Sequence, residues 1–475
     1  MRIICLLNVI TVAVLVVVLD VLLAFTDYDT NETGAVTITS RKRPTQNLKT
    51  LNMLDVPFFY VYEELFFSNA TVGNYTLIEW MQYQRERRHS KHEDDYWFAI
   101  ASLQHPLRTK DPSLAKLFVV PLITNQITGD MDYYKLKICV RFEHLNNGTL
   151  CQQQLLQHAD WTLEASPWFQ KSQGRNHILV ASDHMAPYFL TPYKHLSHCN
   201  VIGFEHSRWN ALSRMFLPKL YVGTRCLHNN GGVGGGDRPH DVVMVARIKE
   251  KFTTRRRICT YLKNQTVVSV ANCGGGQQCP ALAQSKLGFH ARGDTPGSNR
   301  LIDLILTGTV PVFTTLEQYD ILPPWIDWAS LSYFVDENLS PASVFLSKLH
   351  DILMGEGLAQ KLKALLDNYA LVDWEFNSDI VFEQYMYAFA RTLLPQEQKR
   401  MQAARSPFSA LDLSAFETLQ PMQDGNFVYC YAGQRVSSCQ DCSWCTGQCM
   451  PCKHGSTNDP SAKCVPRYNA TCRMK

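Results

Sequence analysis

The chain has 475 residues, with 46 Lys and Arg against 43 Asp and Glu, a formal net charge of +3. This near balance argues against a dedicated nucleic-acid-binding protein, because such proteins carry a strong basic excess or a basic stripe. Hydrophobic residues make up 45% of the chain, which excludes disorder throughout. The 16 cysteines suit an oxidising compartment if they pair as disulfides.

The N-terminus carries an apolar segment of membrane-spanning length. Residues 3–25 are apolar except for three polar positions. A bilayer is spanned by about 20 residues, whereas the apolar core of a secretory signal has about 7 to 15. Arg2 precedes the segment and acidic residues follow it, which orients the N-terminus to the cytosol. We expect residues 1–27 to be the signal-anchor helix of a single-pass type II membrane protein, with a cleaved signal as the alternative.

The rest of the chain is expected to be lumenal in either case. N-x-Ser/Thr triplets fit this expectation, since they are glycosylated only in the secretory pathway. They begin at Asn31, Asn69, Asn74, Asn147, Asn264 and Asn469. A further triplet at Asn338 is a weaker candidate because Pro341 follows it. Residues 28–55 are polar and lack an apolar period, so they are interpreted as a stem.

Residues 56–228 alternate apolar runs with more polar segments of helical length, which predicts a parallel α/β domain. The apolar runs are FFYVY at 58–62, AKLFVVPLI at 115–123, HILVAS at 177–182 and CNVIGF at 199–204. Residues 229–240 contain five glycines and are interpreted as a linker.

Residues 241–395 predict a second α/β domain. Its expected elements are a strand at 241–246, a helix at 255–263, a strand at 267–270, further alternation over 285–334, and amphipathic helices at 346–366 and 380–394 that close the domain. Two such domains form a cleft at the carboxyl ends of their strands, where open parallel sheets bind ligands.

The C-terminal part differs in composition. Residues 396–424 are interpreted as a second linker, and residues 425–475 as a small cysteine-rich module. The module contains Cys430, Cys439, Cys442, Cys445, Cys449, Cys452, Cys464 and Cys472. These residues favour four disulfides in a lumenal protein and would favour zinc in a reducing compartment.

The α/β body holds seven more cysteines, an odd number. Among them, Cys273 and Cys279 flank a short glycine-rich segment and are expected to close a small disulfide loop. At least one of the seven must be free, cross-linked to the tail or paired with another chain, so a homo- or heterodimer is a possible outcome.

The densest chemical segment is SKLGFHARGDTPGSNRLIDLILTGTVPVF, residues 285–313. A loop rich in small residues precedes an apolar-periodic helix that begins near Asn299. Arg292 and Arg300 can neutralise a diphosphate at the start of this helix, and Asp303, one turn beyond Arg300, can accept hydrogen bonds from ribose hydroxyls. The alternative is that Arg300 and Asp303 only pair with each other on the helix surface.

This segment resembles the nucleotide-sugar motif of the exostosin family, glycosyltransferase family 47. The matching residues are Arg292, Gly293, Asp294, Pro296, Ser298, Arg300, Leu301, Asp303, Gly308, Pro311 and Val312. Residues 323–337 (PPWIDWASLSYFVDE) are similar to a second family element, and residues 59–65, 107–122 and 167–184 resemble its N-terminal blocks.

The resemblance implies a GT-B fold, in which two Rossmann-like domains face a cleft, and a Golgi enzyme. It implies inverting transfer of a sugar from a nucleoside diphosphate donor, such as a UDP-sugar, to a hydroxyl of a glycan or polysaccharide, with no metal and no other cofactor. By the resemblance, Arg292, Ser298 and Arg300 hold the diphosphate and Asp303 the ribose or sugar hydroxyls, with Arg247 as a further phosphate contact. The alternative function is a non-catalytic lumenal partner or chaperone that acts through the cysteine-rich tail.

Inversion requires a base that takes the acceptor proton. Candidates follow strands of the first domain: Asp183 and His184 after HILVAS, and Glu63 or its neighbour Glu64 after FFYVY. The family commonly has His-Asp in this order after the third strand, whereas this chain has Asp183-His184, and Asp183 could instead only cap the following helix. The basic cluster at residues 255–257 is interpreted as a solvated helix face, with binding of an acidic glycan or of the donor phosphate as the minority interpretation.

Overall fold

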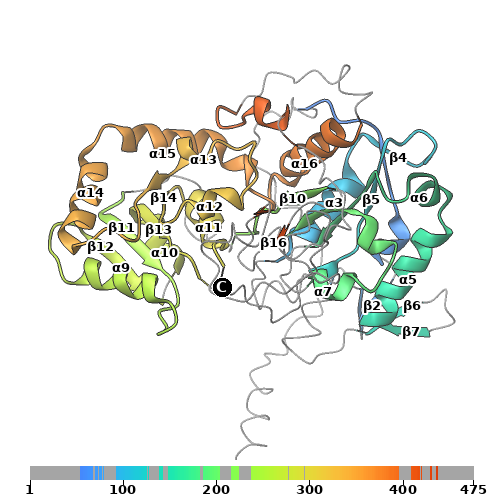
Figure 1. Cartoon of the computed structure of the whole chain (residues 1–475), viewed down its shortest axis with the longest axis horizontal. Coiled ribbons are helices and arrows are strands. Elements are labelled where there is room, and N and C mark those ends of the chain that lie inside the picture. The colour runs from blue at the N-terminus through green and yellow to red at the C-terminus, as the bar shows by residue number, and fades with distance from the viewer. Residues whose placement is uncertain are drawn as a thin grey trace, which may run out of the picture. The chain divides into compact units, whose positions relative to one another are not determined.

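The structure is a computed structural model of the chain (Figure 1). It describes residues 54–67, 70–72, 74–76, 79, 92–125, 127, 139–142, 148–181, 186–203, 215–223, 237–275, 278–293, 295–394, 408–417, 419, 428–429 and 435–436. The apolar segment 3–25, the stem before residue 54, the glycines of 229–240 and all eight tail cysteines therefore lie outside the described residues. Within the described part of the chain, no helix has the length and apolarity needed to span a bilayer.

The first domain is built on a six-stranded sheet in which all neighbouring strands are parallel. Its order is β10-β9-β8-β5-β1-β4. The strands are β1 (Phe59–Val61), β4 (Arg108–Thr109), β5 (Leu117–Val120), β8 (His177–Ala181), β9 (Asn200–Gly203) and β10 (Phe216–Pro218). Every residue of β5, β8, β9 and β10 is buried, as expected of parallel strands covered on both faces. The four apolar runs in the sequence are confirmed as strands of a parallel α/β domain.

Helices connect these strands, and the sequence explains where one of them, α6, begins. They are α3 (Asp94–Gln104), α5 (Gln152–Ala165), α6 (Pro167–Ser172) and α7 (Ala186–Leu190), with 3₁₀ turns η1 (Glu63–Phe66) and η3 (Leu196–His198). At the start of α6, the Ser166 hydroxyl accepts a hydrogen bond from the Phe169 N–H, and Pro167 occupies the first helical position, where its missing N–H costs nothing.

A second, antiparallel sheet in this half was not predicted. Its order is β3-β2-β6-β7, formed by Tyr75–Thr76, Ala70–Val72, Cys139–Phe142 and Gly148–Cys151. Strands of two to four residues are too short to show an alternating apolar pattern, so periodicity could not reveal them.

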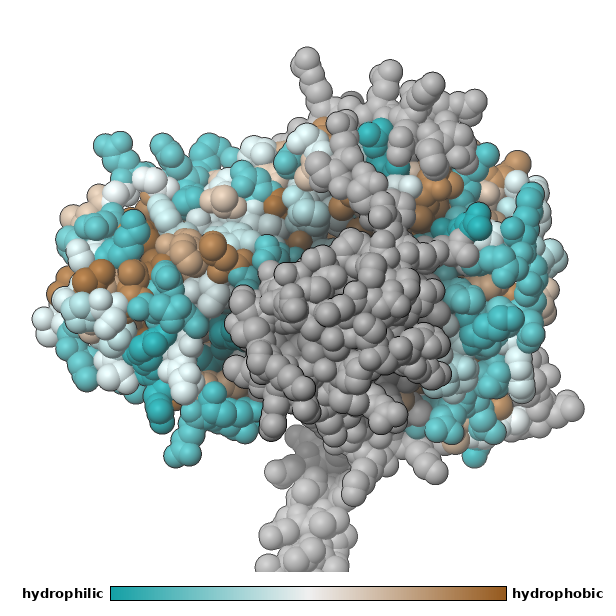
Figure 2. Space-filling view, viewed as in Figure 1, coloured by the Kyte–Doolittle hydropathy of each residue, from teal (hydrophilic) through white to brown (hydrophobic). Residues whose placement is uncertain are grey.

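The second domain has a five-stranded parallel sheet of order β12-β11-β13-β14-β15. Its strands are β11 (His240–Val245), β12 (Val270–Gly274), β13 (Ser285–His290), β14 (Val310–Phe313) and β15 (Tyr333–Phe334). Its helices are α9 (Thr253–Lys263), α10 (Gln278–Ala283), α11 (Arg300–Leu306), α12 (Glu317–Asp320), α13 (Trp328–Leu331), α14 (Ala342–Met354) and α15 (Gly357–Asn368). In the region of α15, the face in Figure 2 is mostly hydrophilic, because this amphipathic helix buries Leu358 and Leu365.

Two element boundaries differ from the prediction. The strand expected at 267–270 instead begins at Val270, because the Gln265 amide closes a turn through the N–H and carbonyl of Val268. The single helix expected over 346–366 is two helices, since α14 ends at Met354 and α15 begins at Gly357. Gly355 between them has an extended backbone, and a Cβ there would lie 3.0 Å from the Asp351 carbonyl oxygen.

The helix α16 (Ser378–Leu393) was expected to close the second domain but packs on the first. Phe382 contacts Phe98 of α3 with ring centroids 4.8 Å apart, and Glu383 Oε1 lies 3.2 Å from His105 Nε2. The Tyr385 hydroxyl also donates to the carbonyl of Pro218 at the end of β10. The end of the predicted second domain therefore returns to the first sheet, a long-range contact that local periodicity does not encode.

Asp373 organises the turn before α16, and its burial makes stability depend on pH. Burial raises its pKa to about 6, although the Glu375 and Phe376 N–H groups and the Asn377 amide donate to the carboxylate. The folded state thus keeps this proton to a higher pH than the unfolded chain, whose carboxyl titrates near 3.8. We expect the free energy of unfolding to fall as pH rises from about 4 to 6, by at most about 3 kcal/mol from this group. Urea unfolding across this range checks it: Asp373→Asn should flatten the profile, and parallel profiles would contradict the assignment.

Part of the predicted linker at residues 396–424 is folded into the core, so the linker interpretation is wrong for residues 408–417. The Asp327 N–H donates to the carbonyl of Ala410, and the Asp412 N–H donates to that of Trp325, both at 2.8 Å. Phe416 is buried and stacks on Trp325 with ring centroids 5.1 Å apart. Six of its ten residues are apolar, but the segment is short and its partners lie in distant parts of the chain, so local sequence patterns did not predict its burial.

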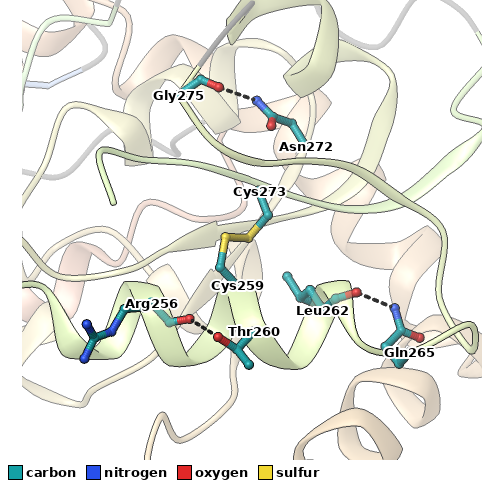
Figure 3. The surroundings of a disulfide bond; sticks show 8 residues. All are labelled: Arg256, Cys259, Thr260, Leu262, Gln265, Asn272, Cys273 and Gly275. Atoms are coloured by element: carbon teal, nitrogen blue, oxygen red, sulfur yellow. Dashed lines mark hydrogen bonds between the residues drawn. A yellow bond between two sulfur atoms is a disulfide. The ribbon is translucent and has the colours of Figure 1, made fainter. Parts of the chain in front are cut away.

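The disulfide between Cys259 and Cys273 joins α9 to β12 (Figure 3). The predicted pairing of Cys273 with Cys279 is therefore wrong, although Cys279 and Cys151 are each disulfide-bonded. The helix α9 lies along β12 and brings Cys259 within 5.6 Å of Cys273 between the Cα atoms, a proximity that the sequence separation of 14 does not reveal. Cys199 is a free thiol but is wholly buried, so it cannot reach another chain and gives no support to a disulfide-linked dimer.

Candidate functional site

The loop after β13 and the first turn of α11 bring together the basic residues predicted to bind the donor. Arg300 is the first residue of α11, and its Nη1 lies 3.0 Å from Oδ2 of Asp303, one turn later. The Asn299 amide also donates to Oδ2. Asp303 is fully buried and Arg300 nearly so, so this pair is part of the interior and not an ion pair on the helix surface. In this arrangement the carboxylate orients the guanidinium.

Arg292 and Ser298 lie on the same loop. Arg292 Nη1 is 3.3 Å from Oε2 of Glu317, and both side chains are about a third exposed, so an incoming anion can compete for this cation. The Ser298 hydroxyl accepts the backbone N–H of Arg300 at 3.1 Å, which ties the loop to the start of α11. Asp294 lies outside the described residues.

Arg255 also belongs to this cluster. From the sequence, ligand binding by residues 255–257 was only a minority interpretation. Arg255 lies on α9, and its guanidinium donates to the carbonyl of Ala291 at 3.3 Å and to that of Arg247 at 3.4 Å. It also lies over the ring of Phe252. Arg247 itself is exposed after β11, so Arg255 links the loop that carries Arg247 to the loop that carries Arg292. In the sequence, the sign of this contact was the run of three arginines at 255–257. The fold shows that Arg255 is the one that reaches the loop after β13.

The Arg255 guanidinium lies so close to the backbone of residue 293 that this position requires a glycine. A Cβ on Gly293 would lie 2.6 Å from Arg255 Nη2. Since a guanidinium can move more easily than backbone, Gly293→Ala should change the free energy of unfolding by less than about 0.5 kcal/mol but displace Arg255. We expect affinity for a nucleoside diphosphate to fall several-fold in calorimetric titration. Gly275→Ala is the matched control, because a Cβ there meets nothing within 4 Å.

A small cavity of about 20 Å³ lies beside this cluster and has walls from both sheets. Gly203 ends β9, Lys219 follows β10 and His290 ends β13, so three strands contribute their carboxyl ends. The remaining wall residues are Leu220, Tyr221, Ser298, Leu301, Ile302, Ile321 and Leu322. The carboxyl edges of the two parallel sheets therefore meet, as predicted for a ligand-binding cleft.

The candidate bases are only partly placed. Asp183 and His184 lie outside the described residues. Glu63 follows β1 in η1, is about half exposed and forms an ion pair with Arg108. Among the described residues, no group of three or more His, Cys, Asp and Glu side chains could hold a metal ion. Of the predicted glycosylation sites, Asn74 and Asn264 are described and exposed, whereas Asn31, Asn69, Asn147 and Asn469 lie outside the described residues.

Comparisons with known proteins locate a family domain on this site. Residues 242–349, which contain the whole Arg255–Asp303 cluster, match the family model of the exostosin GT47 domain. The crystal structure of TarM aligns with a TM-score of 0.28 and 9% identity, over 52% of this chain and 61% of TarM, so the alignment spans less than two thirds of that protein. No curated protein matches. The resemblance drawn from the motif residues is confirmed for this segment: residues 242–349, in the second α/β unit, match the exostosin GT47 domain.

Proposed function

We propose that the protein is a glycosyltransferase that moves a sugar from a nucleoside diphosphate donor to a hydroxyl of a glycan or polysaccharide. The observation that carries this proposal is the cluster of Arg255, Arg292 and Arg300 inside the exostosin GT47 segment, at the carboxyl edge of a parallel sheet. Three cations, on α9, on the loop after β13 and at the start of α11, match the charge of a diphosphate. The presence of a family domain alone would not fix the activity, so the side chains carry the argument.

The arginines act on the leaving group. As the bond between the anomeric carbon and the phosphate oxygen breaks, negative charge develops on the diphosphate. Arg300 is held in place by Asp303, and Arg255 by two backbone carbonyls, so neither cation has to reorganise during the reaction. In this proposal the neutralisation of the diphosphate falls to arginine, with a UDP-sugar as co-substrate and no resident metal.

The acceptor side is assigned to the first sheet. An inverting transfer needs a base on the face of the sugar opposite the diphosphate, to take the acceptor proton as its oxygen attacks. Strands β9 and β10 of the first sheet end at the same cavity as β13, and β8, which precedes Asp183 and His184, is the neighbour of β9 in that sheet. Asp183, His184 and Glu63 remain the candidates. Glu63 would first have to leave its ion pair with Arg108.

The proposal includes a cellular setting. The apolar segment at residues 3–25 and the exposed triplets at Asn74 and Asn264 support a type II protein of the Golgi membrane with its α/β domains in the lumen. The Cys259–Cys273 disulfide agrees with an oxidising lumen.

A donor panel tests the function. The full-length protein in detergent is expected to melt at a higher temperature with UDP or with one UDP-sugar, and to transfer that sugar to a glycan acceptor. The stereochemistry of the product, read by NMR, should be inverted relative to the donor. Absence of binding to every common nucleoside diphosphate and its sugars would refute the proposal.

A further inference from the structure

His290, the last residue of β13, carries a buried imidazole that makes no hydrogen bond with the described part of the protein. Its backbone carbonyl accepts a hydrogen bond from the Gln318 amide. The ring packs edge-on against Phe313 with centroids 5.2 Å apart, and 1% of the residue is exposed. A buried polar group without a partner lowers stability, because it has lost water and gained nothing in return. Such a group calls for a ligand or an ordered water that satisfies it.

The imidazole lines the cavity at the carboxyl edges of the two sheets. About 20 Å³ of this cavity is accessible to water-sized groups, which suits a small substituent such as a hydroxyl. Much of its wall is apolar, with Leu301, Ile302 and Leu322 among its residues. A hydroxyl carried on a carbon atom fits such a wall, since the carbon meets the apolar side chains and the hydroxyl meets the imidazole.

The charge state of His290 favours a hydroxyl over a phosphate. Burial, with Arg255 and Arg300 nearby, lowers its pKa to about 3, so the ring is neutral under physiological conditions. A neutral imidazole offers one N–H donor and one acceptor, the same pair that a hydroxyl presents. The arginines stabilise a bound anion more strongly than this neutral ring does.

Lys219, on the opposite wall, already has partners within the first domain. Its Nζ lies 3.0 Å from His92 Nδ1, 3.6 Å from Asp94 Oδ1 and 4.1 Å from the ring centroid of Tyr221. Its charge is thus balanced by Asp94, and the imidazole of His290 is the polar side chain in this wall for which the described residues provide no partner.

Building on the proposed function, we propose that the cavity receives one hydroxyl-bearing substituent of the donor sugar and that His290 hydrogen-bonds this hydroxyl. The residue then selects the donor, because a site built to bond a hydroxyl discriminates against a sugar that lacks it. In this proposal His290 contacts the sugar and not the diphosphate, so the binding of nucleoside diphosphate without a sugar is expected to be independent of His290.

Calorimetric titration of the full-length protein with UDP and with UDP-glucose, UDP-galactose, UDP-xylose and UDP-N-acetylglucosamine tests this role. For the preferred UDP-sugar, His290→Leu is expected to lower affinity about tenfold while affinity for UDP is unchanged. His290→Gln keeps a donor and an acceptor and should recover part of the loss. The leucine variant should melt at the same or a higher temperature than the wild type, because an unsatisfied polar group has been removed.

The outcomes separate this inference from the function on which it rests. If the wild type binds neither UDP nor any of the sugars, both fail. If it binds them and His290→Leu leaves the sugar preference intact, the inference alone fails. Equal loss of UDP and UDP-sugar, or a markedly lower melting temperature for the leucine variant, would make His290 a structural residue and also overturn it.

Discussion

Arg300→Ala is expected to reduce sugar transfer at least about 100-fold and to remove most of the affinity for UDP. The guanidinium is nearly buried and fixed by Asp303 at 3.0 Å, so it presents an oriented charge to the diphosphate without a cost of reorganisation. Loss of one such preorganised group from a site where charge develops costs about 10² to 10³ in rate. Initial-rate kinetics and calorimetry with the preferred UDP-sugar measure both effects.

Two variants make this result interpretable. Arg256→Ala removes an exposed arginine from the neighbouring helix α9 and should leave transfer and binding unchanged. Asp303→Asn keeps the volume of the side chain but removes the charge that holds Arg300, so we expect weaker donor binding together with lower stability. Wild-type kinetics in Arg300→Ala would show that the donor binds elsewhere.

Phe416→Ala is expected to lower the free energy of unfolding by about 3 to 5 kcal/mol, the usual cost of removing a fully buried aromatic side chain. Phe416 stacks on Trp325 and meets Tyr387 of α16 edge-on at 4.9 Å, so it joins the second domain to the helix that packs on the first. Chemical denaturation monitored by tryptophan fluorescence measures the loss.

Ser414→Ala serves as the control for Phe416. Ser414 lies on the same segment but is exposed and bonds only to Asp412. Its replacement should change stability by less than about 0.5 kcal/mol. A Phe416 variant as stable as this control would mean that residues 408–417 are a linker, as the sequence analysis predicted for residues 396–424.

The central strands of both sheets were accessible to prediction for a physical reason. Parallel strands are buried on both faces and appear as continuous apolar runs such as LFVV in β5 and VPVF in β14. The donor loop was equally accessible, because its arginines and small residues lie within one short stretch of chain. By contrast, the contacts of α16 with α3 join residues about 280 positions apart, as in the 278 between His105 and Glu383. No local pattern contains that information.

The residues of the site also divide into those predicted from the local sequence and those identified only from the fold. Arg292, Ser298, Arg300 and Asp303 were named from the motif, and the structure adds that Asp303 is buried and pairs with Arg300. Arg255 and His290 are assigned to the site only from the fold. Arg255 lies against Gly293, and His290 lines the cavity.

The sequence by itself determined the α/β class, the tandem parallel sheets and the exostosin GT47 segment, since each depends on residues close together in the chain. Only the tertiary structure decided which cysteines pair, which domain α16 covers, that residues 408–417 are core, and which polar groups meet at the cavity. Those features depend on burial and on long-range contacts, and both are set by how the elements pack and not by the order of residues within them.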